Sequence, residues 1–169
     1  MLGGQCRIKL EGVRMIVAGT GHRELRDRDW IADKTEKALI DMGASLVYVG
    51  MASGFDLLLA KTAWSLGIPF IAAKPWKGHQ PRVADKYDYG RALHHAVEVV
   101  DVSDLEDYPG AWVYEVRNRY MVDRAEVVLA VLEAGTKGGT YNCVKYASGK
   151  KPVRIIDPLM REEFKIEAQ

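Results

Sequence analysis

Cysteine is scarce in this chain of 169 residues, which contains only Cys6 and Cys143. Because the two thiols lie far apart and outside any Cys-x-x-Cys pattern, they indicate neither a disulfide framework nor a zinc-binding knuckle. Long apolar runs are also lacking: residues 1–11 have no apolar core of a secretion signal, and no stretch approaches about 18 apolar residues. We therefore expect a cytoplasmic protein with no membrane partner.

A strong excess of charge of one sign is lacking too, because 24 lysines and arginines face 23 aspartates and glutamates. No overall field would draw the molecule to nucleic acid or to an anionic membrane, so a nucleic-acid partner is not expected and any anion site must be local. The four histidines show no metal-ligand spacing. The sequence therefore predicts no metal site and no required cofactor.

Short apolar runs alternate with segments of helical periodicity along most of the chain. Such alternation implies right-handed βαβ units and a parallel sheet covered on both faces. The length suits one domain, residues 1–169, with a charged tail at 159–169 that is expected to fray. The predicted fold is an α/β, Rossmann-like three-layer sandwich with a mostly parallel sheet, with strands at 13–18, 45–49, 68–73, 97–102, 126–132 and 152–156 and helices at about 29–42, 56–66, 82–96, 112–124 and 140–148.

Three glycine-bearing segments follow predicted strands, at residues 19–23, 50–56 and 138–140. Because the carboxyl ends of parallel strands meet at one edge of the sheet, the segments would together form a pocket lined by backbone N–H groups and helix N-termini, which favours phosphate. Each segment taken alone is also typical of an ordinary turn between a strand and a helix.

In the first segment, Gly19 and Gly21 flank Thr20, so the backbone can bend sharply and come close to a ligand. Arg23 would either bind a phosphate through two parallel hydrogen bonds or lie solvated at the surface. The third glycine of the dinucleotide fingerprint is missing, since His22 and Arg23 follow Gly21. This departure disfavours a Rossmann dehydrogenase.

In the second segment, Gly50 and Gly54 lie four residues apart, Ser53 can donate a hydrogen bond, and Asp56 opens the following helix. Asp56 would either stabilise the N-terminus of that helix or contact a ribose hydroxyl or a basic group in the pocket. No Lys-Ser or Lys-Thr pair follows the glycines, which excludes a P-loop nucleoside triphosphatase.

In the third segment, Gly138 and Gly139 can form a concave nest of N–H groups, and Thr140 is predicted as the N-cap of the next helix. This is the most phosphate-like of the three segments. On the preceding helix, Arg117 and Met121 lie one turn apart, so Arg117 would either enter the pocket or extend into solvent. No Gly-x-Ser-x-Gly elbow or catalytic cysteine pattern occurs, so acyl-transfer hydrolysis lacks a nucleophile.

Taken together, five motifs resemble the YpsA-like branch of the SMF/DprA-LOG superfamily over roughly residues 14–158. They are Thr20–Arg23, Gly50–Asp56, Pro75-Trp76 with Gln80 downstream, Arg117–Asp123 and Gly138–Thr140. The resemblance implies a Rossmann-like fold and a pocket for nucleotides or for nucleotide-derived ligands such as ADP-ribose.

One group within this superfamily, the Lonely Guy phosphoribohydrolases, cleaves the N-glycosidic bond of nucleoside 5′-monophosphates. Its Arg-Lys-x-x-Met motif is similar to Arg117–Met121, with Asn118 in place of the lysine, and Cys143 stands where its second motif has a glutamate. Glycosidic cleavage needs a carboxylate, which Asp56 or Glu115 could supply only in a different geometry.

The leading hypothesis is a protein that binds a small-molecule nucleotide or nucleotide derivative such as ADP-ribose, NAD or a nucleoside monophosphate. A nucleotide N-glycosidase, with Asp56 and Arg117 as candidate catalytic residues, is the second hypothesis, and single-stranded nucleic-acid binding or scaffolding is the third.

Tyr87 and Tyr89, both expected to be exposed, leave room for a homodimer or a larger homo-oligomer. Trp76 or His22 is expected to pack near the base or sugar. The candidate ligand-contacting residues are Gly19, Thr20, Gly21, His22, Arg23, Gly50, Ser53, Gly54, Asp56, Trp76, Arg117, Asn118, Gly138, Gly139 and Thr140.

Overall fold

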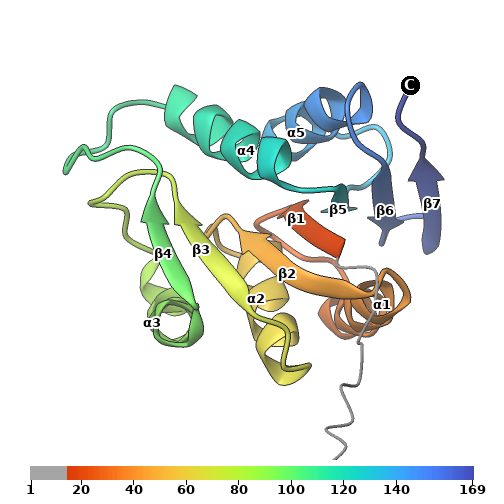
Figure 1. The fold of residues 1–169 in the computed structure, drawn as a ribbon, viewed down its shortest axis with the longest axis horizontal. Helices are drawn as coiled ribbons and strands as arrows, with labels where there is room; N and C mark the ends of the chain where they lie inside the picture. The colour runs from red at the N-terminus through yellow and green to blue at the C-terminus, as the bar shows by residue number, and fades with distance from the viewer. Residues whose placement is uncertain (1–14) are drawn as a thin grey trace, which may run out of the picture.

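The computed structural model describes residues 15–169, so Cys6, the segment searched for a secretion signal and the first two residues of the strand predicted at 13–18 lie outside the described residues. Seven strands form one sheet in the order β4-β3-β2-β1-β5-β6-β7 (Figure 1). Neighbouring strands are parallel except for β6 and β7, which are antiparallel. The strands are β1 (Met15–Gly21), β2 (Ala44–Val49), β3 (Phe70–Lys74), β4 (Glu98–Asp101), β5 (Val127–Val131), β6 (Val153–Asp157) and β7 (Glu162–Ile166).

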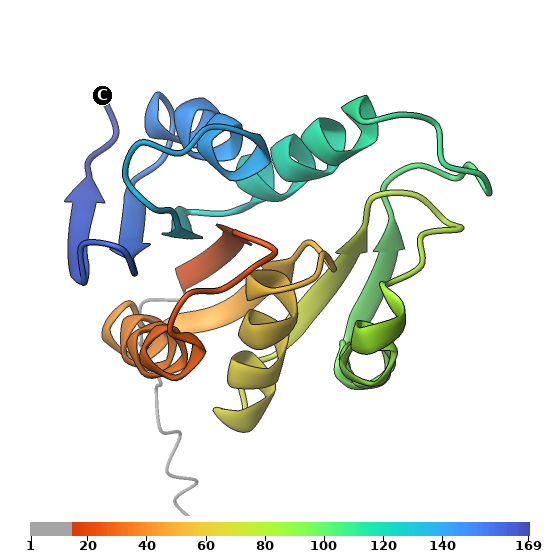
Figure 2. The same cartoon turned by 180° about the vertical axis from the view of Figure 1, so that it is seen from behind.

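Helices cover both faces of this sheet, as the two opposite views show (Figures 1 and 2). Successive residues of a strand point to opposite faces, and Val17 accordingly belongs to the core under α1 to α3 while Ala18 belongs to the core under α4 and α5. This arrangement confirms the predicted α/β sandwich with a mostly parallel sheet. The helices are α1 (Arg28–Asp41), α2 (Phe55–Ser65), α3 (Lys86–His95), α4 (Trp112–Arg124) and α5 (Gly139–Ser148), with a short 3-10 helix η1 (Val83–Asp85) before α3.

The order of the strands contains a topological switch point between β1 and β5. From β1 the chain adds β2, β3 and β4 on one side, then returns through α4 and adds β5 and β6 on the other side. The connections that leave the carboxyl ends of β1 and β5 therefore diverge to opposite faces. Ligands of open α/β sheets bind in the crevice that such divergence leaves.

The first strand is longer than the sequence pattern indicated. Its prediction ended at residue 18, but the strand continues through Gly21, and Gly19 and Gly21 pair in register with Leu129 and Val131 of β5. The two glycines therefore belong to the sheet rather than to a sharp turn after it.

The last strand, β7, lies in the segment expected to fray. It pairs antiparallel with β6, and its Glu163 forms ion pairs with Arg154 and Lys34, each at 3.0 Å. The strand could not be predicted from the charged composition, because Glu163 is neutralised by Lys34 and Arg154, which precede the tail in the sequence. The charged tail therefore supplies β7, the edge strand on one side of the sheet.

The helix predicted at 82–96 is divided into η1 and α3, and two tyrosines of α3 differ in exposure. Tyr87 is exposed as expected, but Tyr89 is only 5% exposed, so its predicted exposure is wrong. The Tyr89 hydroxyl lies 3.0 Å from Nδ1 of His79 and donates to the His79 carbonyl at 3.1 Å. No helix within residues 15–169 is long and apolar enough to cross a membrane.

Candidate functional site

A cavity of about 670 Å³ lies at the carboxyl edge of the sheet, next to the switch point. Its volume falls within the roughly 300 to 1,000 Å³ that is usual for small-molecule sites. The lining comes from the end of β1, the turn before α2, the first turns of α4 and the start of α5. The lining residues are Thr20, Gly21, His22, Arg23, Ala52, Asp56, Ala111, Trp112, Tyr114, Glu115, Arg117, Asn118, Arg119, Lys137, Gly139, Thr140, Asn142, Cys143 and Tyr146.

Arg117 forms the buried floor of the cavity, with only 5% of its surface exposed. It donates a hydrogen bond from one terminal nitrogen to the Gly50 carbonyl, and its Nε donates to Oδ1 of Asn118 at 2.8 Å. A Cβ added at Gly50 would lie 2.7 Å from that terminal nitrogen and 2.8 Å from Oδ2 of Asp56. The absence of a side chain at Gly50 therefore lets the guanidinium and the carboxylate approach the same point.

Asp56 is the buried acidic residue beside the Arg117 guanidinium. It lies in the first turn of α2 and is 5% exposed, and its Oδ2 accepts a hydrogen bond from the Ala52 N–H at 2.9 Å. Burial raises the pKa of Asp56, and the positive charge of Arg117 and the Ala52 hydrogen bond oppose that rise. Burial likewise lowers the pKa of Arg117, against the charge of Asp56. The two residues thus compensate each other's charge inside the protein.

The glycines of the first segment serve the contact between β1 and α2. A Cβ at Gly19 would lie 2.0 Å from Cδ2 of Leu59, and one at Gly21 would lie 2.5 Å from Cβ of Phe55. Gly21 reaches the cavity as well, whereas Gly19 does not line it. The prediction is that the backbone at Gly19 comes close to a ligand. In the structure Gly19 instead lets β1 come close to α2.

Gly54 joins the first two segments. Its backbone has φ +78°, and a Cβ there would lie 2.2 Å from the Arg23 carbonyl oxygen. The next residue, Phe55, donates its N–H to the His22 carbonyl at 3.1 Å. The start of α2 is thereby fixed against the end of β1, and Gly54 itself stays outside the cavity.

The other residues of the first segment point toward the cavity or its rim. The Thr20 side chain points to the face of the sheet opposite to the one on which Gly19 and Gly21 contact α2. It lies beside the Cys143 thiol and lines the cavity. The Arg23 guanidinium lies 5.0 Å from the centre of the Tyr114 ring. Nε2 of His22 accepts the Glu133 N–H at 3.0 Å, which joins the loops after β1 and β5.

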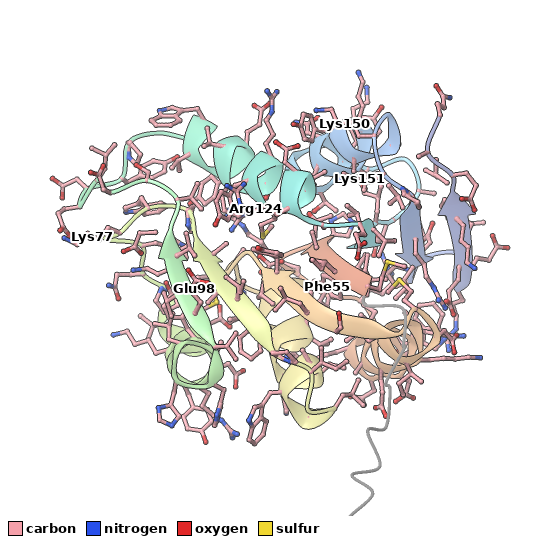
Figure 3. All side chains as sticks on the ribbon, in the orientation of Figure 1. Phe55, Lys77, Glu98, Arg124, Lys150 and Lys151 are labelled. Atoms are coloured by element: carbon pink, nitrogen blue, oxygen red, sulfur yellow. The ribbon has the colours of Figure 1, made fainter. Side chains whose placement is uncertain are left out.

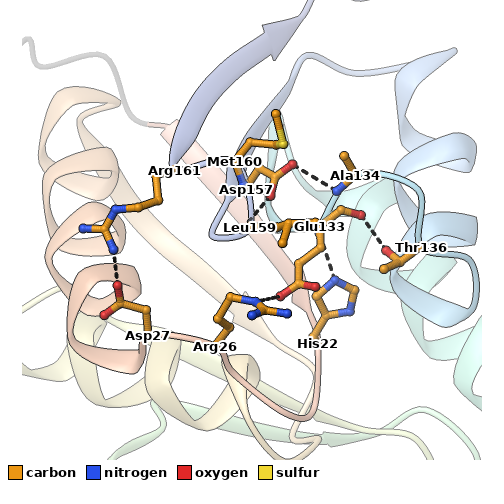
Figure 4. A network of polar contacts seen from close by, with 10 residues as sticks. All are labelled: His22, Arg26, Asp27, Glu133, Ala134, Thr136, Asp157, Leu159, Met160 and Arg161. Carbon is orange, nitrogen blue, oxygen red and sulfur yellow. Dashed lines mark hydrogen bonds and ion pairs between the residues drawn. The ribbon is translucent and has the colours of Figure 1, made fainter.

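Figure 4 shows that His22 is part of a wider polar network. In it, Arg26 pairs with Glu133 at 3.1 Å, and the buried Asp157 accepts the Ala134 N–H at 2.9 Å. Asp157 also accepts hydrogen bonds from the backbone after β6. These contacts hold the loop after β5, which leads to the third glycine segment, in one position.

The third segment is open toward the cavity. The helix α5 begins at Gly139 with Gly138 as its N-cap, so the prediction of Thr140 as N-cap is wrong. Gly138 adopts φ +124°, which a residue with a side chain would avoid. Gly139 and Thr140 line the cavity beside Lys137, and the N–H groups of this first helical turn have no partner within the helix.

Two predicted residues are engaged elsewhere. Ser53 donates to Oδ2 of Asp85 at 2.5 Å and accepts a hydrogen bond from Arg82 at 3.0 Å. Trp76 is 8% exposed, and its ring lies 4.7 Å from that of His79 and 5.9 Å from that of Tyr114. Neither residue lines the cavity, and neither do Gly19, Gly50, Gly54 and Gly138.

Four of the lining residues missing from the predicted list come from α4. Trp112, Glu115 and Arg119 recur at helical spacing and line the cavity together with Tyr114. Arg119 forms an ion pair with Glu115. Helical spacing from Arg117 reaches Tyr114 but not these three residues, so the sequence offered no signal for them.

Several cations lie outside the cavity, on the side of the molecule covered by α4 and α5. Arg124, Lys150 and Lys151 are among them (Figure 3). The cations that do line the cavity are Arg23, Arg117, Arg119 and Lys137, against the two carboxylates Asp56 and Glu115. The cavity therefore has an excess of positive charge that the composition of the chain does not reveal.

Fold and site together define a doubly wound α/β domain with a cationic cavity at its switch point. No family model matches the chain. Over 89 residues it is 39% identical to the uncharacterized SPbeta prophage-derived protein YoqJ of Bacillus subtilis, a match that covers 46% of this chain and 51% of that protein. The chain thus spans about half the length of this curated relative.

Two solved structures have a similar fold. DNA processing protein A (DprA) of Helicobacter pylori, described with a single-stranded DNA binding mode, matches with a TM-score of 0.67 at 19% identity, over 83% of this chain and 64% of that one. The molybdenum cofactor binding protein of Rippkaea orientalis matches with a TM-score of 0.57 at 18% identity, over 85% of this chain and 77% of that one. At such identities the matches show a shared fold.

Proposed function

We propose that the cavity binds a nucleotide or a nucleotide derivative, such as AMP, ADP-ribose or NAD, with a phosphate at the N-terminus of α5. The observation that carries this proposal is the opening of Gly139 and Thr140 into a cavity that Lys137 also lines. Free N–H groups and the positive end of the helix dipole favour an anion there. Arg23 adds a second positive charge at the wall of the same cavity.

The fold similarities support a ligand of this chemistry. The related structures include a protein described with single-stranded DNA and one described with the molybdenum cofactor. Together with the motifs around Thr20, Arg117 and Gly139, they support placing this chain in the SMF/DprA-LOG superfamily. The YpsA-like branch remains the narrower proposal within it.

Isothermal titration calorimetry with AMP, ADP-ribose and NAD tests the proposal. Lys137→Glu should weaken binding about tenfold or more, because it replaces a phosphate-binding cation by an anion. Lys37→Glu is the matched control, since Lys37 is an exposed residue of α1 on the other side of the sheet. Binding of none of the three ligands, or binding of a single-stranded oligonucleotide alone, would exclude the small-nucleotide proposal.

A second candidate is cleavage of the N-glycosidic bond of a nucleotide, favoured by the two carboxylates that line the cavity. Asp56 lies beside Arg117, and Glu115 is paired with Arg119 at the wall. A carboxylate could stabilise an oxocarbenium-like transition state or activate water. Release of free base from a panel of nucleoside monophosphates should then occur in the wild type and be lost in Asp56→Asn or Glu115→Gln, whereas a panel without release excludes this activity.

A further inference from the structure

Trp112 stands apart from the other tryptophans in the described part of the chain. Trp30 lies beneath Lys34 and Arg161, Trp64 is stacked on His95 at 4.3 Å, and Trp76 belongs to a buried aromatic cluster. Among residues 15–169, Trp112 is the tryptophan with no aromatic ring or cation on its ring, and it lines the cavity with 52% of its surface exposed.

The orientation of this exposed indole is fixed. Its Nε1 donates to the Pro109 carbonyl at 2.9 Å, which satisfies the one polar atom of the ring. Gly110 has φ +118°, and a Cβ there would lie 3.1 Å from Cδ1 of Trp112. The chain thus holds a flat apolar surface at the cavity wall in advance of any ligand, and only the apolar part of that ring is left to interact.

Resting on the proposed nucleotide function, we infer that Trp112 stacks on the base, so that the site takes ligands with a planar aromatic ring in preference to a sugar phosphate alone. Trp112 lines the same cavity as Lys137, Gly139 and Thr140, so a ligand with its phosphate at the start of α5 can place its base against the indole. The role expected for Trp76 thereby passes to a residue that actually lines the cavity.

Calorimetry with AMP and ribose 5-phosphate separates the two parts of the ligand. Trp112→Ala should weaken AMP binding roughly 10-fold to 100-fold, the range expected for one lost base-aromatic stack, and leave ribose 5-phosphate affinity unchanged within about twofold. Trp112→Phe should retain most of the AMP affinity. AMP should also quench tryptophan fluorescence in the wild type and in the control Trp64→Phe, but not in Trp112→Phe.

Three results would overturn this assignment. The first is unchanged AMP affinity in Trp112→Ala. This result counts against the assignment even if the variant differs from the wild type in oligomeric state. The second is equal weakening of AMP and ribose 5-phosphate in a variant whose melting temperature has dropped, which indicates a structural role. The third is binding of neither ligand by the wild type, which would also overturn the nucleotide proposal, whereas the first two leave that proposal standing.

Discussion

The glycines of the first two segments and those of the third have opposite surroundings. Around Gly21, Gly50 and Gly54, a Cβ would meet a neighbouring atom at 2.8 Å or less, whereas around Gly138 and Gly139 it would meet nothing within 4 Å. Gly21 is the last residue of β1 and the others follow strands, all at the same edge of the sheet. Glycine at this edge therefore has two distinct uses in this molecule.

In the closed region, glycine permits contacts within the protein: α2 lies against β1, and Arg117 and Asp56 meet over Gly50. In the open region, glycine exposes the first turn of α5 to the cavity. Substitutions in the closed region should therefore change the free energy of unfolding, and substitutions in the open region should change ligand affinity.

The largest expected effect is that of Arg117→Met. The variant loses the hydrogen bonds of the buried guanidinium to the Gly50 carbonyl and to Asn118, and it loses the positive charge that opposes the rise in the pKa of Asp56. The free energy of unfolding should fall by about 3 kcal/mol or more, because each hydrogen bond from a charged group contributes about 1.5 to 3 kcal/mol. Urea denaturation measures this loss. Arg119→Met, which removes an exposed partner of Glu115, should change stability by about 1 kcal/mol or less. Comparable losses in the two variants would contradict the contrast between the buried and the exposed arginine.

Gly54→Ala should have the next largest effect, a loss of about 2 to 3 kcal/mol from backbone strain and steric overlap combined. The added methyl group would overlap the Arg23 carbonyl at φ +78°. Gly67→Ala is the matched control, because Gly67 has φ +70° and open space around its Cβ position. Its loss should be about 1 kcal/mol, from strain alone. If the two losses are equal, the contact between the first two segments contributes nothing.

Asp56 should make the stability depend on pH in a defined direction. Burial raises its pKa in the folded state above the ordinary value of 3.8, so the folded state holds the proton more tightly than the unfolded state. The stabilisation from this group is present below pH 3.8 and is lost as the pH rises through the folded pKa. The stability of the wild type relative to Asp56→Asn should therefore fall over that window, and urea titrations at a series of pH values that show it rising would contradict the assignment.

The fold could be predicted from the sequence because each β-branched run and each helical periodicity agrees with one layer of the sandwich. The edge strand β7 could not, since its stability depends on Arg154 and Lys34, which the local sequence does not bring near Glu163. The end of β1 was misplaced because glycine was interpreted as a terminator. At Gly19 and Gly21 the deciding contact is with α2, a contact that only the folded chain creates.

The candidate site could be predicted in outline. Arg23, Asp56 and Arg117 do line one cavity, as the parallel sheet required. Ser53 was assigned to the pocket from its position in a glycine segment, but Asp85, 32 residues later, accepts its hydrogen bond. Trp112 was not assigned, since an exposed tryptophan at the start of a helix has no distinguishing local pattern. The partners of these side chains lie far away in the sequence, so the local pattern does not reveal them.

The smallest expected change in stability is also the sharpest test of the open region. Proline is tolerated at the first position of a helix, so Gly139→Pro should keep stability within about 1 kcal/mol of the wild type while removing one N–H from the start of α5. If that N–H binds the phosphate, AMP affinity should fall about tenfold, the equivalent of one lost charge-assisted hydrogen bond. Gly139→Ala keeps the N–H and has room for its methyl group, so it should bind AMP like the wild type. Because both variants replace the same glycine, weakening in both would implicate the added atoms, and weakening in neither would place the phosphate away from α5.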